Sequence, residues 1–367
     1  MRCARTDKGV HASGNVISLK MIVEDPDIVQ KINEHLSAQI RVWGIQVTNK
    51  SFSCYHLCDS RVYEFLIPSH CFLPPHHSTY LGRKIVEIAE KEGDLEGFQE
   101  RQSEVATFWK EADEEFIKPI LENTPEEIRV LVEQALGLVE KPEDSTESAP
   151  KSTEGQDAAQ PTQENNTTET EPLDEAAEAR RLQVIEVVKA VKAAYVKAKR
   201  SYRIPATRLA RIQAALDQYV GTKNFFNYTI QKRDTDPSAR RYIKSFKLNQ
   251  TPIIINDTEW LSLKVHGQSF MMHQIRKMVA MAALVVRCGC VPERIADSYG
   301  STKIAIPKAP GLGLLLERPI FDTYNNKKAV QTEKGPIDFS MYEAEINEFK
   351  QREIYDRIFR EEQETKA

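Results

Sequence analysis

An acidic residue between two basic residues near the start of the chain has the composition of a catalytic turn. Residues 5–12 read RTDKGVHA, so Asp7 has Arg5 on one side and Lys8 on the other. Nearby positive charge favours the ionised carboxylate, and Gly9 permits a backbone conformation that a side chain would oppose. A fixed, ionised carboxylate is suited to nucleophilic attack. The alternative is an ordinary surface turn, in which the aspartate bonds its own backbone.

Three distant segments join this turn in an ordered set of motifs. They read CDSRVYEFLIP at residues 58–68, GQSFMMHQIRKM at residues 267–278 and IPKAPGLGL at residues 306–314. With residues 4–12, and in this order, they closely resemble the TruA-type tRNA pseudouridine synthases, and the two middle segments resemble the eukaryotic multisite branch. Four ordered motifs are far more specific than any single one.

The resemblance implies an isomerase that converts uridine in RNA to pseudouridine. That reaction breaks the N-glycosidic bond, turns the uracil in the site and joins its C5 to C1′ of the ribose, and it requires no cofactor. Matched residue by residue, the resemblance makes Asp7 the catalytic aspartate and Tyr63 the ring-stacking tyrosine and proton acceptor. It makes Arg276 the arginine that pairs with the aspartate.

Further basic residues are expected to bind the RNA substrate. By the same resemblance Arg5 supports Asp7, while Lys8 and His11 contact phosphate or brace the turn. On the strand predicted at residues 61–67, side-chain alternation directs Arg61 to the same face as Tyr63. The full predicted substrate-binding set is Arg5, Lys8, His11, Arg61, Lys197, Arg200 and Lys277.

Two predicted helices carry the remaining members of that set. An Ala-rich helix at residues 174–199 has an apolar face and a cationic face, which suits either phosphate binding or simple solvation. A second helix is predicted from about residue 269, with Arg276 and Lys277 on the side away from its buried stripe. A snorkelling arginine is the alternative role for Arg276.

The pattern of elements predicts an α+β fold. Residues 15–21 and 61–67 are rich in β-formers, and residues 27–36 and 85–91 have helical spacing. We expect two α+β lobes that form one extended mixed or antiparallel sheet, flanked by helices, with a central catalytic cleft. The predicted domains are a first lobe at 1–80, a helical insert at 81–139, a disordered acidic linker at 140–173, a long basic helix with the second lobe at 174–335, and a C-terminal helix at 336–367.

The charge of the chain is unevenly distributed. The net charge of the 367 residues is −4, but residues 140–175 hold 11 acidic residues against 2 lysines. The other residues therefore hold 48 lysines and arginines against 43 acidic residues, a mildly basic balance that fits an RNA partner. Pro, Ser, Thr, Glu, Gln and Asn dominate the acidic segment, which cannot bury a core.

The six cysteines do not have the spacing of a secreted disulfide framework, so a reducing compartment is expected. The pairs Cys54/Cys58 and Cys288/Cys290 could supply four thiolates to a structural zinc ion. Neither pair has the usual two-residue gap, so core packing is the favoured interpretation.

The sequence also yields expectations about location and partners. No apolar run is long enough to span a membrane, and we expect a monomer that binds tRNA and other structured RNA such as messenger or small nuclear RNA. Nucleus is the expected location, with mitochondrion as the alternative. Family members carry a strand and a helix ahead of the catalytic turn, so we expect this sequence to lack them together with any upstream targeting segment.

Two other classes of function remain as alternatives. The first is a catalytically impaired RNA-binding protein or tRNA chaperone, which the expected amino-terminal truncation favours. The second is a structural protein that uses the acidic segment as an interaction arm.

Overall fold

The computed structural model describes residues 1–136 and 175–365, with the side chains of residues 175, 176 and 365 left out. The predicted disordered linker at residues 140–173 lies outside the described residues. None of the described helices is long and apolar enough to cross a membrane.

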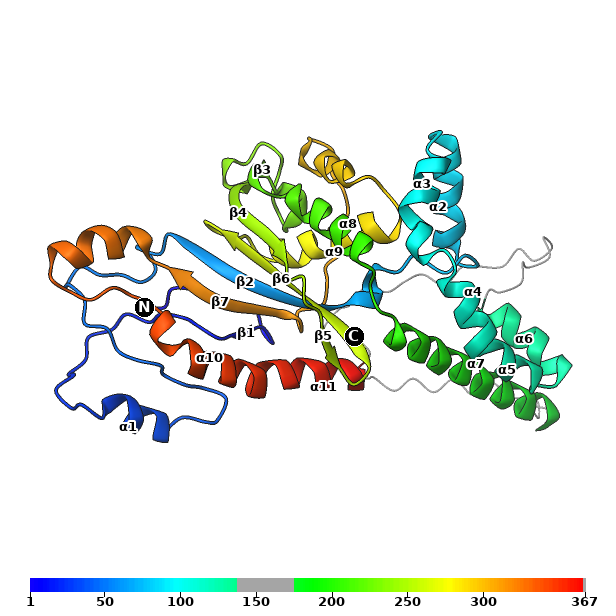
Figure 1. The fold of residues 1–367 in the computed structure, drawn as a ribbon, viewed down its shortest axis with the longest axis horizontal. Coiled ribbons are helices and arrows are strands. Elements are labelled where there is room, and N and C mark those ends of the chain that lie inside the picture. The colour runs from blue at the N-terminus through cyan, green and yellow to red at the C-terminus, as the bar shows by residue number, and fades with distance from the viewer. Residues whose placement is uncertain (137–174, 366–367) are drawn as a thin grey trace, which may run out of the picture. The chain divides into compact units, whose positions relative to one another are not determined.

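One mixed sheet holds the fold together (Figure 1). Its order is β1-β7-β2-β6-β4-β3, with β5 paired to β6. β1 runs parallel to β7, and the other pairs are antiparallel. The strands are β1 (His11–Ala12), β2 (Ser60–Pro68), β3 (Gly221–Asn224), β4 (Arg240–Leu248), β5 (Ile253–Ile255), β6 (Thr258–Gly267) and β7 (Leu314–Ile320). This arrangement confirms the α+β prediction, because strands from both ends of the chain share the sheet.

The helices are interspersed along the whole described chain. They are α1 (Ile28–Glu34), α2 (Tyr80–Lys91), α3 (Leu95–Gln102), α4 (Phe108–Ala112), α5 (Lys118–Glu122), α6 (Glu126–Leu136), α7 (Glu175–Ser201), α8 (Ala206–Asp217), α9 (Gln274–Arg287), α10 (Glu343–Phe349) and α11 (Asp356–Thr365). A π-helical turn, Lys350–Tyr355, joins α10 to α11.

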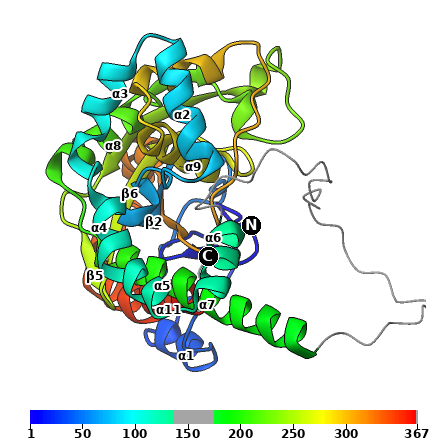
Figure 2. The ribbon, with the colours of Figure 1, turned by 90° about the vertical axis from the view of Figure 1, so that its right-hand side faces the viewer.

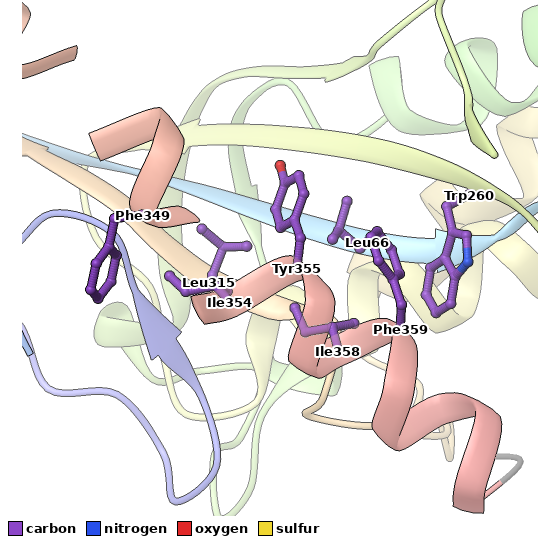
Figure 3. Packing of buried hydrophobic residues seen from close by; sticks show 8 residues of the cluster. All are labelled: Leu66, Trp260, Leu315, Phe349, Ile354, Tyr355, Ile358 and Phe359. Atoms are coloured by element: carbon purple, nitrogen blue, oxygen red, sulfur yellow. The ribbon is translucent and has the colours of Figure 1, made fainter. Parts of the chain in front are cut away.

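The C-terminal helices cover one face of the sheet (Figure 3). Their apolar side chains pack onto sheet residues in a cluster formed by Leu66, Trp260, Leu315, Phe349, Ile354, Tyr355, Ile358 and Phe359. Because side chains alternate along a strand, Tyr63 and Phe65 of β2 point to the opposite face from Leu66. The C-terminal helices therefore leave the face of Tyr63 free for other elements.

A fully buried arginine anchors α8. The guanidinium of Arg208 donates to the carbonyl of Phe72 at 2.9 Å and to the side chain of Gln102 at 3.2 Å. Its ion pair with Glu104 measures 3.4 Å. A buried charge is costly unless it is paired in this way, so this network fixes the segment after β2 against α8.

The described residues divide into two compact units. The first comprises Met1–Pro74, Leu95–Val105 and Arg200–Ala367, and it contains the whole sheet. The second comprises Pro75–Asp94 and Ala106–Lys199, with α5, α6 and most of α7 side by side (Figure 2). The predicted domain boundaries stay a prediction.

One local prediction was wrong. Residues 15–21 form no strand, and only Ile17 makes an isolated bridge, to Arg2. α8 ends at Asp217, and Gly221 begins β3 with a φ of +96°.

Candidate active site

Asp7 lies in a tight turn immediately before β1. The Val10 amide donates to the carbonyl of Asp7 at 3.1 Å, and Gly9 has a φ of +80°, the left-handed conformation that favours glycine. β1 then pairs with β7, through His11 and Leu315, and ties the end of the turn to the sheet. The predicted role of Gly9 in shaping this turn is confirmed.

Arg276 reaches Asp7 from the first turn of α9. One guanidinium nitrogen, Nη1, lies 4.0 Å from Oδ2 of Asp7. The side chain of Arg276 is 13% exposed and that of Asp7 is 39% exposed, so the contact lies at the edge of the interior. The structure thus brings together two residues that are remote from each other in the sequence.

The fourth motif orients Arg276. Its Nε donates to the carbonyl of Ala309 at 2.6 Å, and the Ala309 amide donates back to the carbonyl of Arg276 at 3.3 Å. A Cβ on Gly311 would lie 3.5 Å from the central guanidinium carbon, so the loop passes close to the side chain. The loop at residues 306–313 therefore serves as a backbone clamp on Arg276.

Tyr63 is buried in β2 on the face away from the C-terminal helices. Its ring packs edge-on against Phe270, with 5.2 Å between the centroids. Burial raises the pKa of Tyr63 to about 12; Arg61 opposes this increase, and the negative charge of Asp7 adds to it. Tyr63 therefore keeps its phenolic proton at neutral pH and lies within electrostatic reach of Asp7.

Arg61 braces the segment that leads into the turn. Its Nη2 donates to the carbonyl of Cys3 at 3.0 Å. Cys3 is itself buried, in a cluster with Cys54, Phe321 and Tyr324. The structure thus gives Arg61 a bracing contact, and its predicted contact with RNA stays a prediction.

The remaining predicted residues around the turn separate into two groups. Arg5 and Lys8 are exposed beside Asp7. His11 instead lines a surface hollow with α10 and α11 residues, and burial together with Arg357 lowers the pKa of its imidazole. The structure does not bring His11 to Asp7.

The basic residues on α7 and α9 have partners within the protein. Lys197 lies over the ring of Phe116, with Nζ 5.6 Å from the centroid. Arg200 lines a small surface hollow with Glu362. Lys277 donates to the backbone carbonyls of Asn227 at 3.2 Å and Thr229 at 3.4 Å.

Sequence reasoning left three neighbouring side chains out of the site. Nδ1 of His273 lies 3.3 Å from Oδ2 of Asp7, closer than Arg276. The other two are Lys303 and Lys308, which lie close enough to Lys277 to affect its charge. Burial lowers the pKa of Lys277, and the positive charges of Lys303 and Lys308 lower it further. The signals were a histidine three residues before Arg276 and lysines in and before the fourth motif.

The structural zinc ion considered for the cysteine pairs stays a prediction, and among the described residues the six thiols do not belong to a group of three or more close ligand atoms. All six thiols are free, and those of Cys54 and Cys58 donate to the carbonyls of Met1 and Ser60. In the part of the chain that the structure describes, the side chains close enough to share a metal ion are instead His76, His77 and Asp113.

His76 already has partners for both ring nitrogens. Nδ1 lies 2.7 Å from the Ser78 hydroxyl, and Nε2 lies 3.1 Å from a carboxylate oxygen of Asp113. The other oxygen of Asp113 accepts a hydrogen bond from Tyr195 at 2.8 Å. A hydrogen-bonded network accounts for this cluster without an ion.

Comparison with known proteins gives a consistent result. A family model described as tRNA pseudouridine synthase matches residues 215–322, the stretch from the end of α8 to just beyond β7. "tRNA pseudouridine synthase 1" of Eremothecium gossypii is 44% identical over 99% of this chain and 61% of its own length. The protein of the same name from Schizosaccharomyces pombe is 41% identical over 98% of this chain and 70% of its own length.

A more distant relative is matched over more of its own length. The "tRNA pseudouridine(27/28) synthase" of Saccharomyces cerevisiae is 33% identical over 99% of this chain and 81% of its own length. The chain spans about three fifths of the length of several curated relatives that it matches.

Proposed function

The chain belongs to the tRNA pseudouridine synthase family, and we propose that it isomerises selected uridines of tRNA to pseudouridine. Asp7 is the proposed nucleophile. The observation that supports this assignment most directly is the 4.0 Å approach of Arg276 to Asp7, in a chain whose relatives carry that activity in their names.

The proposed reaction needs a carboxylate that is both ionised and held in place. One oxygen of Asp7 bonds to C1′ of the ribose while the C1′–N1 bond breaks and its electron pair passes to the uracil. After the ring turns, C5 bonds to C1′ and the aspartate leaves. The positive charge of Arg276 lies beside the carboxylate that attacks C1′ and that is released when C5 bonds to C1′.

Tyr63 is the proposed group for proton movement. Isomerisation removes a proton from C5 and adds one to N1, so no proton is gained or lost overall. Since burial raises the pKa of Tyr63 to about 12, its phenol accepts the C5 proton only as it releases its own. Its place beside Phe270 also offers an aromatic surface for the detached ring.

The proposed substrate is a structured RNA from which the target base is extruded. A stacked uridine must leave its helix before a side chain can reach C1′. Exposed Arg5 and Lys8, together with Lys277, Lys303 and Lys308, supply positive charge for the flanking phosphates. The same proposal includes messenger and small nuclear RNA as further substrates. It also includes a monomeric state and a nuclear location.

A tritium-release assay tests the proposal. The protein is incubated with tRNA transcripts labelled at C5 of uridine, beginning with uridines at positions 27 and 28, because the name of one relative refers to them. We expect release into water by the parent chain and release at background rate by Asp7→Asn, whose carboxamide is a poor nucleophile. Filter binding of the same tRNA should be nearly equal for both proteins.

The alternative outcomes separate an enzyme from a binding protein. Binding of tRNA without tritium release by the parent chain would show a tRNA chaperone or RNA-binding protein. Equal release by the parent and by Asp7→Asn would remove Asp7 as the nucleophile.

A further inference from the structure

His273 has an unusual backbone for a residue beside a candidate nucleophile. The helical spacing of the sequence predicted that it lies inside a helix, but α9 begins at Gln274, and His273 precedes it with a φ of +63° and a ψ of 1°. A left-handed conformation at a residue with a side chain costs roughly 1–2 kcal/mol. Such strain persists only where the surrounding structure enforces it.

The neighbouring residues enforce this conformation. The Gln274 side chain accepts a hydrogen bond from the Met271 amide at 2.9 Å, and the Gln274 amide donates to the carbonyl of Met271 at 3.1 Å. The Thr229 hydroxyl donates to the carbonyl of Met272 at 2.9 Å. Contacts on both preceding residues therefore hold the turn that directs the His273 ring toward Asp7.

The ring nitrogen that faces Asp7 has no other partner in the described chain. Nδ1 of His273 is buried and makes no well-formed hydrogen bond, and Oδ2 of Asp7 lies 3.3 Å from it. A buried nitrogen of this kind is costly unless it is paired. The Asp7 carboxylate is therefore the acceptor available to it.

His273 and Arg276 approach the same oxygen of Asp7. Nδ1 of His273 lies 3.3 Å from Oδ2 and Nη1 of Arg276 lies 4.0 Å from it. The printed approach of each residue is to Oδ2, so Oδ1 is the oxygen that we assign to the reacting carbon. A carboxylate held through one oxygen has a defined rotation about its last bond, and this rotation sets where the other oxygen points.

We propose that His273 is a positioning residue for Asp7: its Nδ1–H binds Oδ2 and turns Oδ1 toward C1′ of the extruded uridine. This inference rests on the proposed isomerase function for its effect on rate. The hydrogen bond itself is a property of the protein alone.

The charge state of the imidazole fits this role. Burial lowers the pKa of His273, as do Lys308 and Arg276, while Asp7 opposes them. The ring is therefore neutral at neutral pH, and a neutral ring that faces a carboxylate through Nδ1 carries its proton there. His273 thus donates a hydrogen bond without adding a full positive charge that would weaken the nucleophile.

Three substitutions at His273 distinguish the effect of its side chain from the effect of its left-handed backbone. His273→Gly keeps the left-handed conformation without strain and removes the ring. His273→Asn tolerates the same conformation and places an amide N–H near the position of Nδ1. His273→Gln extends its amide further out, toward the position of Nε2. Glu333→Gly, at another left-handed residue with a φ of +52° that is exposed and takes no part in these contacts, is the matched control.

The expected result is a loss of kcat with little change in KM. His273→Gly should lower kcat for tritium release by about 10- to 100-fold, the range expected when a reacting group is misplaced by about 1 Å. His273→Asn should restore most of the rate and His273→Gln should not, while tRNA binding and melting temperature stay close to those of the parent. Equal kcat for the parent and His273→Gly would overturn the inference and leave the proposed function standing.

A second measurement does not depend on activity. In protein labelled with ¹⁵N-histidine, the signals of His273 are identified by their loss in His273→Asn. We expect a neutral ring protonated at Nδ1, with shifts that change in Asp7→Asn. A ring protonated at Nε2, or shifts unaffected by Asp7→Asn, would overturn the inference. If the parent chain releases no tritium but shows the expected tautomer, the proposed function fails and the hydrogen bond stands.

Discussion

Arg276 and Ala309 hold each other through two backbone-linked hydrogen bonds. Nε of Arg276 donates to the carbonyl of Ala309 at 2.6 Å, and the Ala309 amide donates to the carbonyl of Arg276 at 3.3 Å. The guanidinium is thus oriented from behind by the loop, and its Nη1 remains directed at Asp7. A planar group with several donors is needed to make both contacts at once.

This geometry predicts that lysine cannot replace Arg276. A lysine in Arg276→Lys keeps the charge but has one ammonium group, which cannot bind Ala309 and approach Asp7 together. We expect kcat/KM for tritium release to fall by about 100- to 1,000-fold, the usual effect of removing one oriented charge from an active site. Arg352→Lys, at an exposed arginine paired with Glu348 and Glu353, is the control and should leave the rate unchanged. A rate for Arg276→Lys within a factor of two of the parent would show that orientation is unimportant.

The hydroxyl of Tyr63 is predicted to act in turnover rather than in binding. Tyr63→Phe keeps the ring and its edge-on packing with Phe270, so folding and tRNA affinity should be nearly unchanged. Removing a proton-transfer group slows a reaction by about 100- to 10,000-fold, and we expect kcat to fall within that range. Tyr242→Phe, at a tyrosine that is 45% exposed on β4, serves as the control. A large loss of tRNA affinity with an unchanged kcat would instead assign Tyr63 to substrate binding.

The basic face of α7 is predicted to bind phosphates without regard to base sequence. Charge reversal in Lys197→Glu/Arg200→Glu should weaken all tRNAs alike and make the slope of log affinity against log salt shallower by roughly 1.4–1.8 for two lost phosphate contacts. The control reverses Lys84 and Lys91, two lysines that already pair with Glu87, so the net charge changes equally. The same slope for both double variants would exclude a specific contribution from this face.

Much of the site could be predicted from the sequence because its parts lie in regular or strongly marked segments. Alternating β-formers placed Tyr63 correctly on a strand, and a glycine after an acidic residue predicted the left-handed turn at Gly9. The contact between Asp7 and Arg276 was instead predicted from the family resemblance. Local patterns carry no information about contacts between opposite ends of a chain.

The failures have physical causes that local patterns do not contain. Residues 15–21 have β-forming side chains but only one bridge to another segment, and Ile17 and Leu19 are 64% and 66% exposed. A strand requires a neighbour as well as propensity. Helical spacing around Arg276 extended the predicted helix too far back, because the hydrogen bonds that impose the left-handed turn on His273 come partly from Thr229, which is remote in sequence.

The last prediction concerns the stability of the C-terminal helices on the sheet. The Lys350 ammonium lies 2.5 Å from Glu64, and these side chains are 8% and 2% exposed. The hydroxyls of Ser262 and Tyr355 also donate to Glu64. Removing one partner of a buried ion pair leaves an uncompensated charge, so Lys350→Met should lower the free energy of unfolding by roughly 3–5 kcal/mol.

The pH dependence of the same ion pair follows from the pKa of Glu64. Burial opposes ionisation, but Lys350 and the two hydroxyls outweigh it and hold the pKa below the usual value of 4.5. Because the folded-state pKa is lowered, the stabilisation is complete above the unfolded-state pKa and is lost as pH falls through the folded-state value. Urea titrations of the parent should therefore give a lower free energy of unfolding below pH 4.5 than at pH 7. This decrease should be smaller in Glu64→Gln/Lys350→Met, which lacks the ion pair. The control is Lys247→Met, at an exposed pair with Asp217, which should leave stability almost unchanged at both pH values. If Lys350→Met has an equally small effect, the buried pair contributes little to stability.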